Sequence, residues 1–304
     1  MSHRYGVVAL VGAPNAGKST LLNRLVGAHL AIVSSKPQTT RDRIVGVVTR
    51  PDSQIVLIDT PGLHAASTEL NRAMVKQAEA AVQESDLRLW VVDAIPAARR
   101  AERGEPIVQE PERQLASRLP GPRQVALNKI DVIPRPLLLP VMAAYAELVP
   151  ESAPIPISGL VGDGVEQAIA AILPHLPEGP AAHDADTWTT ATERFLVAEI
   201  VREKIFHYTE QEVPYATAVE VLQFDETQRE AGKLRIMADI IVERDSQKGI
   251  LIGKGGDMLR RIGTAARRDI SELLDARVHL ELFVKVEREW SRSLKGLRRV
   301  GLKL

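Results

Sequence analysis

The sequence contains no cysteine, which excludes disulfide bonds, thiolate zinc sites and cysteine nucleophiles. It also has no excess of charge of either sign, because 39 Lys and Arg balance 39 Asp and Glu. This balance excludes binding to nucleic acid by bulk charge alone. No stretch approaches the roughly eighteen apolar residues that a membrane-spanning helix needs, and the apolar run near residue 7 is too short for a secretion signal. We therefore expect a soluble protein of the cytosol.

The balanced total hides two parts of opposite charge. Residues 246–304 hold 14 Lys and Arg against 7 Asp and Glu, so the rest of the chain carries a matching acidic excess. A length of 304 residues with 45% hydrophobic content is enough for two domains with ordinary cores. An acidic first part and a basic end predict two domains with different partners.

The first half of the chain alternates apolar runs with helical patterns. Strands are expected at residues 7–11, 55–58, 87–92, 124–127 and 155–157, and helices at 19–25, 69–84, 110–119, 137–148 and 164–173. The strands are apolar at successive positions, which is typical of a parallel sheet buried on both faces. The pattern predicts an α/β domain, a mostly parallel sheet flanked by helices. Residues 95–113, rich in Arg, Glu and Pro, are expected to form a solvated loop that leads into a helix.

A Pro-rich stretch at 174–186 predicts a linker. After it the order changes to a helix at 193–208, strands at 216–223 and 234–243, further helices, and a strand at 278–286. Two strands in succession suggest an antiparallel pair and an α+β domain. The expected domains are residues 1–180 and 181–304.

Residues 12–19 (GAPNAGKS), here called the phosphate loop, match the pattern G-x-x-x-x-G-K-[ST] between a predicted strand and a predicted helix. Glycines allow main-chain N–H groups to converge on phosphate oxygens, and the helix N-terminus adds partial positive charge. Lys18 is expected to reach the β- and γ-phosphates, and Ser19 to bind Mg²⁺. The sequence therefore predicts a nucleotide site.

Asn128-Lys129-Ile130-Asp131 follows a predicted strand and so lies at the sheet edge where ligands bind. The Asp131 carboxylate can accept hydrogen bonds from N1–H and the amino group of guanine, a pair of donors that adenine lacks. Lys129 can pack over the base, and Ser158-Gly159-Leu160 can offer main-chain N–H to the guanine oxygen. The predicted nucleotide is GTP or GDP.

Two further segments are expected to complete the site. Asp59 follows a strand and can hold Mg²⁺ through a water, while the Gly62 N–H can contact a γ-phosphate. Thr40 is the favoured third Mg²⁺ ligand, with Thr39 the alternative. The expected catalytic residues are Lys18, Thr40, Asp59 and Gly62, and the expected Mg²⁺ ligands are Ser19, Thr40 and Asp59. The residues expected to bind GTP are Gly12, Ala13, Pro14, Asn15, Ala16, Gly17, Lys18, Ser19, Thr20, Asp59, Thr60, Pro61, Gly62, Asn128, Lys129, Asp131, Ser158, Gly159 and Leu160.

The second domain contains a G-x-x-G loop, Gly253–Gly256, followed by a basic helix. A loop of this kind between two helices brings main chain close to a nucleic-acid strand and clamps about four nucleotides. Ile252, Leu259 and Ile262 are expected to line an apolar groove for bases. The residues expected to bind RNA are Ile252, Gly253, Lys254, Gly255, Gly256, Arg260 and Arg261.

The order of these motifs resembles a translation-factor-like GTPase of the Era family, and the second domain resembles a type II KH domain. The resemblance covers nearly all of residues 5–304. It implies an α/β P-loop GTPase domain followed by an α+β type II KH domain that binds the 3′ end of 16S ribosomal RNA. It also implies a role in assembly of the small (30S) ribosomal subunit.

The resemblance has three further implications. Position 63 is Leu, where Ras-like enzymes carry a water-orienting Gln, and this implies slow intrinsic hydrolysis. Asn15 implies a potassium ion beside the phosphates. Family members are described as partly membrane-associated, and the basic stretch 290–304 is compatible with contact at the inner face of the cell membrane. A monomer is expected.

Two other functions fit parts of the sequence. A P-loop ATPase or kinase would share residues 12–19, but the Asn128–Asp131 motif argues against it. A GTP-regulated RNA-binding or membrane-associated switch with negligible turnover would share every motif, although the presence of Lys18, Ser19 and Asp59 favours an active enzyme.

Overall fold

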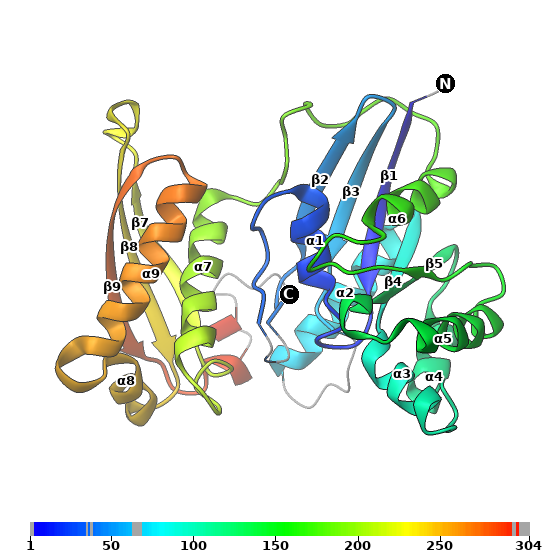
Figure 1. Cartoon of the computed structure of the whole chain (residues 1–304). Coiled ribbons are helices and arrows are strands. Elements are labelled where there is room, and N and C mark those ends of the chain that lie inside the picture. The colour runs from blue at the N-terminus through cyan, green and yellow to red at the C-terminus, as the bar shows by residue number, and fades with distance from the viewer. Residues whose placement is uncertain (1–2, 35, 37–38, 63–68, 294–295, 298–304) are drawn as a thin grey trace. The chain divides into compact units, whose positions relative to one another are not determined.

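The computed structural model describes residues 3–34, 36, 39–62, 69–293 and 296–297. These residues form two compact units (Figure 1). The first contains most of the chain up to Thr190. The second begins at Ala191 and also includes Ile32–Thr39 and a short piece that ends at Ala73. Two segments from early in the sequence therefore belong, by their contacts, to the later unit.

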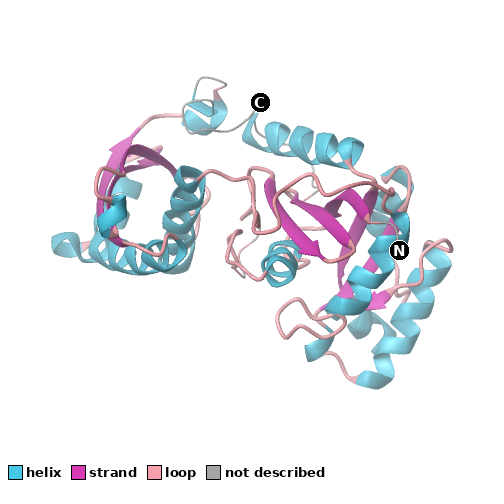
Figure 2. Cartoon of the chain, turned by 90° about the horizontal axis from the view of Figure 1, so that it is seen from above, coloured by secondary structure: helices cyan, strands magenta, loops and turns pink. Residues whose placement is uncertain are grey.

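The first unit is built on a six-stranded sheet of order β2-β3-β1-β4-β5-β6, in which the β2–β3 pair is antiparallel and the other pairs are parallel. Figure 2 shows helices on both sides of this sheet. The strands are β1 (Arg4–Val11), β2 (Ile44–Arg50), β3 (Ser53–Asp59), β4 (Leu87–Asp93), β5 (Arg123–Asn128) and β6 (Ile155–Pro156). The helices are α1 (Lys18–Val26), α2 (Glu69–Glu84), α3 (Ala94–Glu102), α4 (Glu110–Arg118), α5 (Arg135–Leu148) and α6 (Val165–Ile172). The expected α/β architecture is confirmed.

Burial explains why the sequence forms this sheet. Every residue of β3 is buried, and in β4 only Asp93, at its carboxyl end, is partly exposed. Such strands need apolar side chains on both faces, because helices cover both. Trp90 of β4 is 2% exposed and meets Tyr145 of α5 edge to face, with ring centroids 5.8 Å apart. This contact belongs to the core between the sheet and helices α3, α4 and α5.

Two parts of the first unit differ from the sequence-based expectation. The expectation of a loop over residues 95–113 is wrong for the first part of this range, because helix α3 occupies Ala94–Glu102. Asp93 caps this helix by accepting a hydrogen bond from the Ile95 N–H at 3.0 Å, and three alanines form its buried face. Strand β2 was not predicted. A Pro51-Asp52 turn between two β-branched runs was the available signal.

The second unit packs three helices against one face of a three-stranded sheet of order β7-β8-β9. Strands β7 and β8 are antiparallel, as expected, and β8 and β9 are parallel. The strands are β7 (Ala218–Asp225), β8 (Lys233–Val242) and β9 (Arg277–Val286). The helices are α7 (Glu193–Tyr208), α8 (Asp245–Ile252) and α9 (Asp257–Leu273). The predicted α+β order is confirmed.

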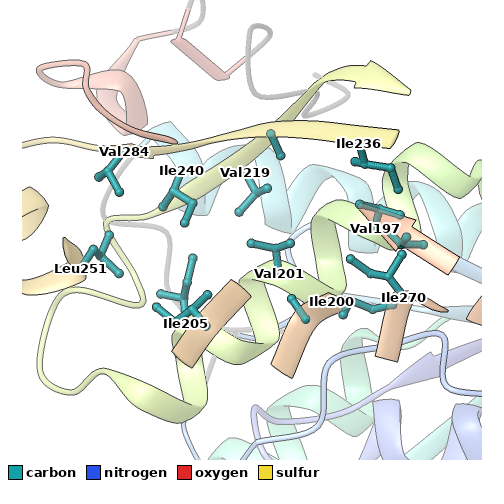
Figure 3. Packing of buried hydrophobic residues seen from close by; sticks show 14 of the residues in the cluster. Val197, Ile200, Val201, Ile205, Val219, Ile236, Ile240, Leu251, Ile270 and Val284 are labelled. Carbon is teal, nitrogen blue, oxygen red and sulfur yellow. The ribbon is translucent and has the colours of Figure 1, made fainter. Parts of the chain in front are cut away.

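The core of this unit lies between α7, α9 and the sheet. Figure 3 shows Val197 and Val201 of α7 facing Ile236 and Ile240 of β8, with Ile270 of α9 beside them. All five side chains are fully buried. Because α7 and α9 share one core with the sheet, the loop before α9 is held on a rigid support. Among the described residues, no helix is both long and apolar enough to cross a membrane.

Candidate nucleotide site and nucleic-acid groove

The phosphate loop joins β1 to α1, at the carboxyl edge of the parallel strands. Its conformation depends on two glycines, Gly12 and Gly17. A Cβ atom on Gly12 would lie 2.2 Å from the Val91 carbonyl oxygen, and one on Gly17, whose φ is +90°, would lie 2.3 Å from Asn128 Nδ2. Asn15 also has positive φ, at 63°. The loop is therefore a strained turn that exposes main-chain N–H groups before a helix N-terminus, the arrangement that binds phosphate.

Lys18 is the first residue of α1 and is 6% exposed. Its Nζ donates hydrogen bonds to the carbonyl oxygens of Gly12 and Ala13, at 3.2 and 3.0 Å. Burial lowers the pKa of Lys18, and the nearby Asp59 carboxylate opposes that shift. A buried ammonium group folded over the loop is well placed to receive the negative charge of a polyphosphate.

Three oxygen-bearing side chains converge beside Lys18. Ser19 Oγ donates to Asp59 Oδ2 at 2.6 Å, Thr40 Oγ1 donates to the same oxygen at 3.1 Å, and the two hydroxyl oxygens are 3.0 Å apart. These are the residues expected to hold Mg²⁺ from three separate segments. Thr40 contributes its hydroxyl to the cluster, whereas the hydrogen bond of Thr39 uses its carbonyl oxygen and points to a different partner.

The cluster fits a magnesium ion. Asp59 is fully buried, and its Oδ1 atom has no hydrogen-bond partner among the described residues. Burial raises the pKa of Asp59, and Lys18, Ser19 and Thr40 oppose that shift. A cation would satisfy the unpaired oxygen and compensate the buried carboxylate. The donors are all oxygen atoms, which Mg²⁺ prefers.

The segment after Asp59 lies against the phosphate loop. Thr60 Oγ1 donates to the Leu10 carbonyl oxygen at 2.7 Å and is buried. A Cβ atom on Gly62 would lie 2.8 Å from the main-chain nitrogen of Pro14. Only glycine allows this approach, so the Gly62 main chain is held beside the phosphate site. Pro61, between Thr60 and Gly62, is also buried, and Leu63 lies outside the described residues.

Asn128 joins three loops of the site. Its Nδ2 donates to the Ala16 carbonyl oxygen of the phosphate loop at 2.9 Å. Its Oδ1 accepts from the N–H groups of Lys129 and Gly159, at 2.8 and 2.9 Å. Asn128 is 2% exposed, so its side chain acts as an internal bracket between the phosphate loop, the 128–131 motif and the 158–160 loop.

The other residues expected to contact the guanine base differ in how exposed they are and in their partners. Asp131 is exposed in a short 3₁₀ turn, which leaves its carboxylate accessible to a base. Lys129 has φ of +70°, and its Nζ pairs with Asp93 at 2.6 Å. Ser158 is fully buried and accepts from the Val161 N–H at 3.0 Å, while Leu160 is 66% exposed. The structure thus brings these residues to one edge of the sheet.

Two residues of this region were missed by the sequence reasoning. Arg24 of α1 donates from Nη2 to the Leu160 carbonyl oxygen and so ties the 158–160 loop to α1. Asp93 both caps α3 and pairs with Lys129. Asp93 ends a buried strand at the same edge as Asp59 and Asn128, and this position was the signal available for it. Arg24 follows no motif.

In the second unit, the G-x-x-G loop connects α8 to α9. Gly253, Gly255 and Gly256 all have positive φ. A Cβ atom on Gly253 would lie 2.8 Å from Met258 Cβ, whereas no atom of the described residues lies within 4 Å of a Cβ placed on Gly255 or Gly256. Gly253 is therefore needed for packing, and Gly255 and Gly256 expose main chain at the surface. Lys254 within the loop is exposed.

A groove of about 390 Å³ lies next to this loop. The groove is lined by Gly256, Leu259, Arg260, Gly263, Thr264, Arg267, Leu280 and Leu282. Leu259 lines it as expected, but the expectation for Ile262 is wrong, because that side chain is fully buried in the core. The apolar floor comes instead from β9. Ile252, the last residue of α8, packs against the core and is only partly exposed.

Arginines extend the basic surface along α9. Arg260 lines the groove, and Arg261 stacks over the Tyr208 ring at 4.9 Å on a neighbouring face of the helix. A second hollow of about 900 Å³ includes both of them. It is also lined by Arg267, Arg268 and Arg277. An apolar strip with arginines on its rim suits a single nucleic-acid strand, with bases inside and phosphates outside.

Comparisons with known proteins identify a family for each of the two parts of the chain. Residues 7–129 match the family model described as 50S ribosome-binding GTPase, and residues 212–291 match that of the KH domain. GTPase Era of Geobacter sp. (strain M21) is 50% identical over 298 residues, which cover 98% of this chain and 97% of the relative. GTPase Era of Ruminiclostridium cellulolyticum is 42% identical over 305 residues, covering 100% of this chain and 99% of the relative.

Two solved structures are similar over the whole length. One is a point variant of Aquifex aeolicus Era bound to GDP and AlF4⁻, with a TM-score of 0.92 and 36% identity, covering 99% of this chain and 100% of the other. The second is Era in complex with MgGDPNP and nucleotides 1506–1542 of 16S ribosomal RNA, with a TM-score of 0.91, 36% identity and the same coverage. From these relatives and its two matching domains, this chain belongs to the Era family of GTPases and is an enzyme that hydrolyses GTP.

Proposed function

We propose that this GTPase binds the 3′ end of 16S ribosomal RNA through its KH domain, under control of GTP, and acts in assembly of the small ribosomal subunit. The observation that carries the proposal is the open G-x-x-G loop beside a groove with an apolar floor and arginine rim. The similar solved Era structure holds 16S ribosomal RNA nucleotides, which supports the same class of ligand here.

In the proposed hydrolysis, the chain positions GTP and neutralises charge instead of forming a covalent intermediate. Ser19, Thr40 and Asp59 would hold Mg²⁺, which supplies positive charge to the phosphates. Lys18 contributes a buried ammonium group, and Gly62 offers a main-chain N–H beside Pro14. Asn128 holds the two base loops against the phosphate loop, and the exposed Asp131 would accept hydrogen bonds from the base, so that the phosphates lie in the loop in one orientation.

Potassium is part of the same proposal. Asn15 lies in the phosphate loop with a positive φ of 63°, and its family resemblance associates it with a bound K⁺. A monovalent cation at this point would add charge where arginine acts in other GTPases. We expect faster turnover in potassium than in sodium buffer at equal ionic strength. Equal rates in the two buffers would remove K⁺ from the proposal.

The decisive experiment measures affinity for a 16S 3′-end oligonucleotide with the full chain loaded with a non-hydrolysable GTP analogue or with GDP. Tighter binding in one nucleotide state supports the proposal, and equal affinity in both contradicts the control by GTP. Lys18→Ala is the matched control. It should abolish hydrolysis and the difference between nucleotides, while binding of the oligonucleotide without nucleotide stays at the wild-type level.

Single-turnover hydrolysis separates this function from the alternative of a switch with negligible turnover. The positions of Lys18, Ser19 and Asp59 favour an active site. A measurable rate that Lys18→Ala removes supports the enzyme. GTP that stays intact over many hours with RNA present would favour the switch.

Localisation and assembly state remain predictions of the sequence. We propose a cytoplasmic monomer whose basic end contacts the inner face of the cell membrane. Of that end, the described part stops at Leu297, which is fully buried. Sedimentation with anionic and neutral vesicles tests the membrane contact, and light scattering tests the monomer. Equal recovery with both vesicle types would contradict an electrostatic contact.

A further inference from the structure

The segment before Thr40 belongs to the second unit and is bonded to α7. The Val33 N–H donates to Glu203 Oε1 at 3.2 Å, and the Val33 carbonyl oxygen lies 3.1 Å from His207 Nε2. Lys36 Nζ donates to the carbonyl oxygens of Phe206 and Thr209 at the end of the same helix. These bonds attach Val33 and Lys36 to α7 and to its C-terminal end without using any residue of the nucleotide motifs.

Arg202 makes a further bond of this kind, to Thr39, which precedes the site residue Thr40 in the sequence. Its Nη2 donates to the Thr39 carbonyl oxygen at 2.5 Å. Its Nε and Nη2 donate to the two carboxylate oxygens of Glu199, at 2.8 and 2.6 Å. The Arg202 side chain is 4% exposed and its guanidinium also lies 5.6 Å from the Phe206 ring centroid. A bidentate carboxylate and a ring hold this guanidinium in one orientation.

The neighbouring residue in the chain is Thr40, whose hydroxyl lies 3.1 Å from Asp59 and 3.0 Å from Ser19. The peptide group between Thr39 and Thr40 is planar, so the direction of the Thr39 carbonyl also sets the direction of the Thr40 N–H and Cα. A donor fixed on the Thr39 oxygen therefore limits where the Thr40 hydroxyl can lie.

From this geometry we propose that Arg202 is a positioning residue for GTP hydrolysis. It holds the Thr39 carbonyl so that the Thr40 hydroxyl stays at the Mg²⁺ site. The inference rests on the proposed role of Thr40 as a metal ligand. Arg202 itself does not contact nucleotide or metal; it acts through one peptide group.

Helix α7, which carries Arg202, also contacts α9, the helix that lines the RNA groove. Glu203 Oε2 accepts from Lys204 Nζ at 2.8 Å, and Lys204 also pairs with Asp269 of α9. Burial alone would lower the pKa of Lys204, but the hydrogen bonds to Asp269 and Glu203 outweigh burial, and the pKa is raised. The ammonium therefore stays charged between the segment and the helix that lines the groove. If GTP with Mg²⁺ changes the affinity for RNA through these contacts, RNA must change the affinity for GTP with Mg²⁺ by the same factor.

The test uses Arg202→Lys in the full chain, because Arg202→Ala would leave Glu199 as an uncompensated buried charge. Lysine keeps the positive charge but lacks the planar guanidinium, whose N–H groups donate to Glu199 and Thr39 at the same time. We expect the Mg²⁺ concentration for half-maximal kcat to rise at least about tenfold, the size of one lost hydrogen bond to a charged group. The kcat at saturating Mg²⁺ should return to within about threefold of wild type, and GDP affinity measured without Mg²⁺ should stay within about twofold.

Arg194→Lys is the matched control. Arg194 lies on the same helix, donates to a main-chain carbonyl, that of Val221, at 3.2 Å, and lies 5.7 Å from the Phe224 ring centroid. It thus makes the same two kinds of contact within the KH domain. We expect no change in Mg²⁺ dependence for this variant. An equal change in both variants would mean that Arg202 acts only through stability, and would overturn the inference.

Thr40→Ala separates failure of this inference from failure of the proposed site. If Thr40→Ala leaves the Mg²⁺ dependence unchanged, the proposed metal site is wrong and the inference falls with it. If Thr40→Ala raises the Mg²⁺ requirement but Arg202→Lys does not, only the positioning role is overturned. Because Arg202 acts through Thr40, Arg202→Lys should have no further effect in the Thr40→Ala background. Additive effects of the two substitutions would contradict the mechanism.

Discussion

Substitution of Asn128 by alanine tests the bracket that joins the phosphate loop to both base loops. The side chain makes three hydrogen bonds of 2.8 to 2.9 Å and is 2% exposed. Each bond contributes about 1 kcal/mol net, so the free energy of unfolding should fall by about 3 kcal/mol. GTP affinity should fall by about a hundredfold, since the loops that bind phosphate and base lose their common support.

Asn23→Ala is the control for this prediction. Asn23 also makes three hydrogen bonds, to Leu30 and Ala31, at 2.9 to 3.0 Å, but away from the base loops. Its loss should cost about the same free energy of unfolding. We expect GTP affinity to stay within about threefold of wild type. Urea unfolding and fluorescent-nucleotide titration measure the two quantities. Equal losses of GTP affinity in both variants would refute the specific role of Asn128.

Three further predictions concern single contacts. Asp131→Asn should weaken guanine nucleotides by about ten- to a hundredfold and improve xanthine nucleotides, with little change in unfolding because the side chain is exposed; unchanged base preference in competition titrations would contradict the assignment. Gly17→Ala should abolish nucleotide binding, because its Cβ would lie 2.3 Å from Asn128 Nδ2. Gly104→Ala, also at positive φ but with no atom of the described chain within 4 Å of its Cβ, should bind GTP normally, and calorimetric titration compares the two variants. Gly256→Asp should weaken RNA binding at least about tenfold by placing negative charge at the strand, and Gly232→Asp, at a similar positive φ in the same unit, should not; similar RNA affinities in a filter-binding assay would place recognition elsewhere.

Much of the nucleotide site could be predicted because its residues follow buried strands. Asp59 and Asn128 each end an apolar run, and parallel strands bring their carboxyl ends to one edge. The spacing of the phosphate-loop motif is fixed because a side chain at Gly12 or at Gly17 would collide with a specific neighbouring atom. The second domain was predictable for similar reasons, since α7 and the strands of its sheet follow apolar patterns that the core of the unit explains.

Other contacts could not be predicted, because no local pattern encodes them. Helix α3 was not predicted because its arginines suggested a solvated loop. Its buried face consists of alanines, which are too weakly apolar to give a clear helical periodicity. Ile262 was placed in the groove because it follows the G-x-x-G loop, but the turn of α9 directs it into the core. The bond from Arg202 to Thr39 joins residues 163 apart in sequence, and such a pair leaves no periodic signal.

The contacts of Val33, Lys36 and Thr39 with α7 also set an order of events during synthesis. Val33 and Glu203 are 170 residues apart. A ribosome adds about 5–20 residues per second, so the segment is made roughly 8 to 34 s before its helix. An unfinished chain can thus contain the whole phosphate loop while the carbonyl of Thr39 still lacks its donor. If Arg202 positions Thr40 as proposed, a growing chain cannot reach full hydrolytic activity before helix α7 has been made and folded.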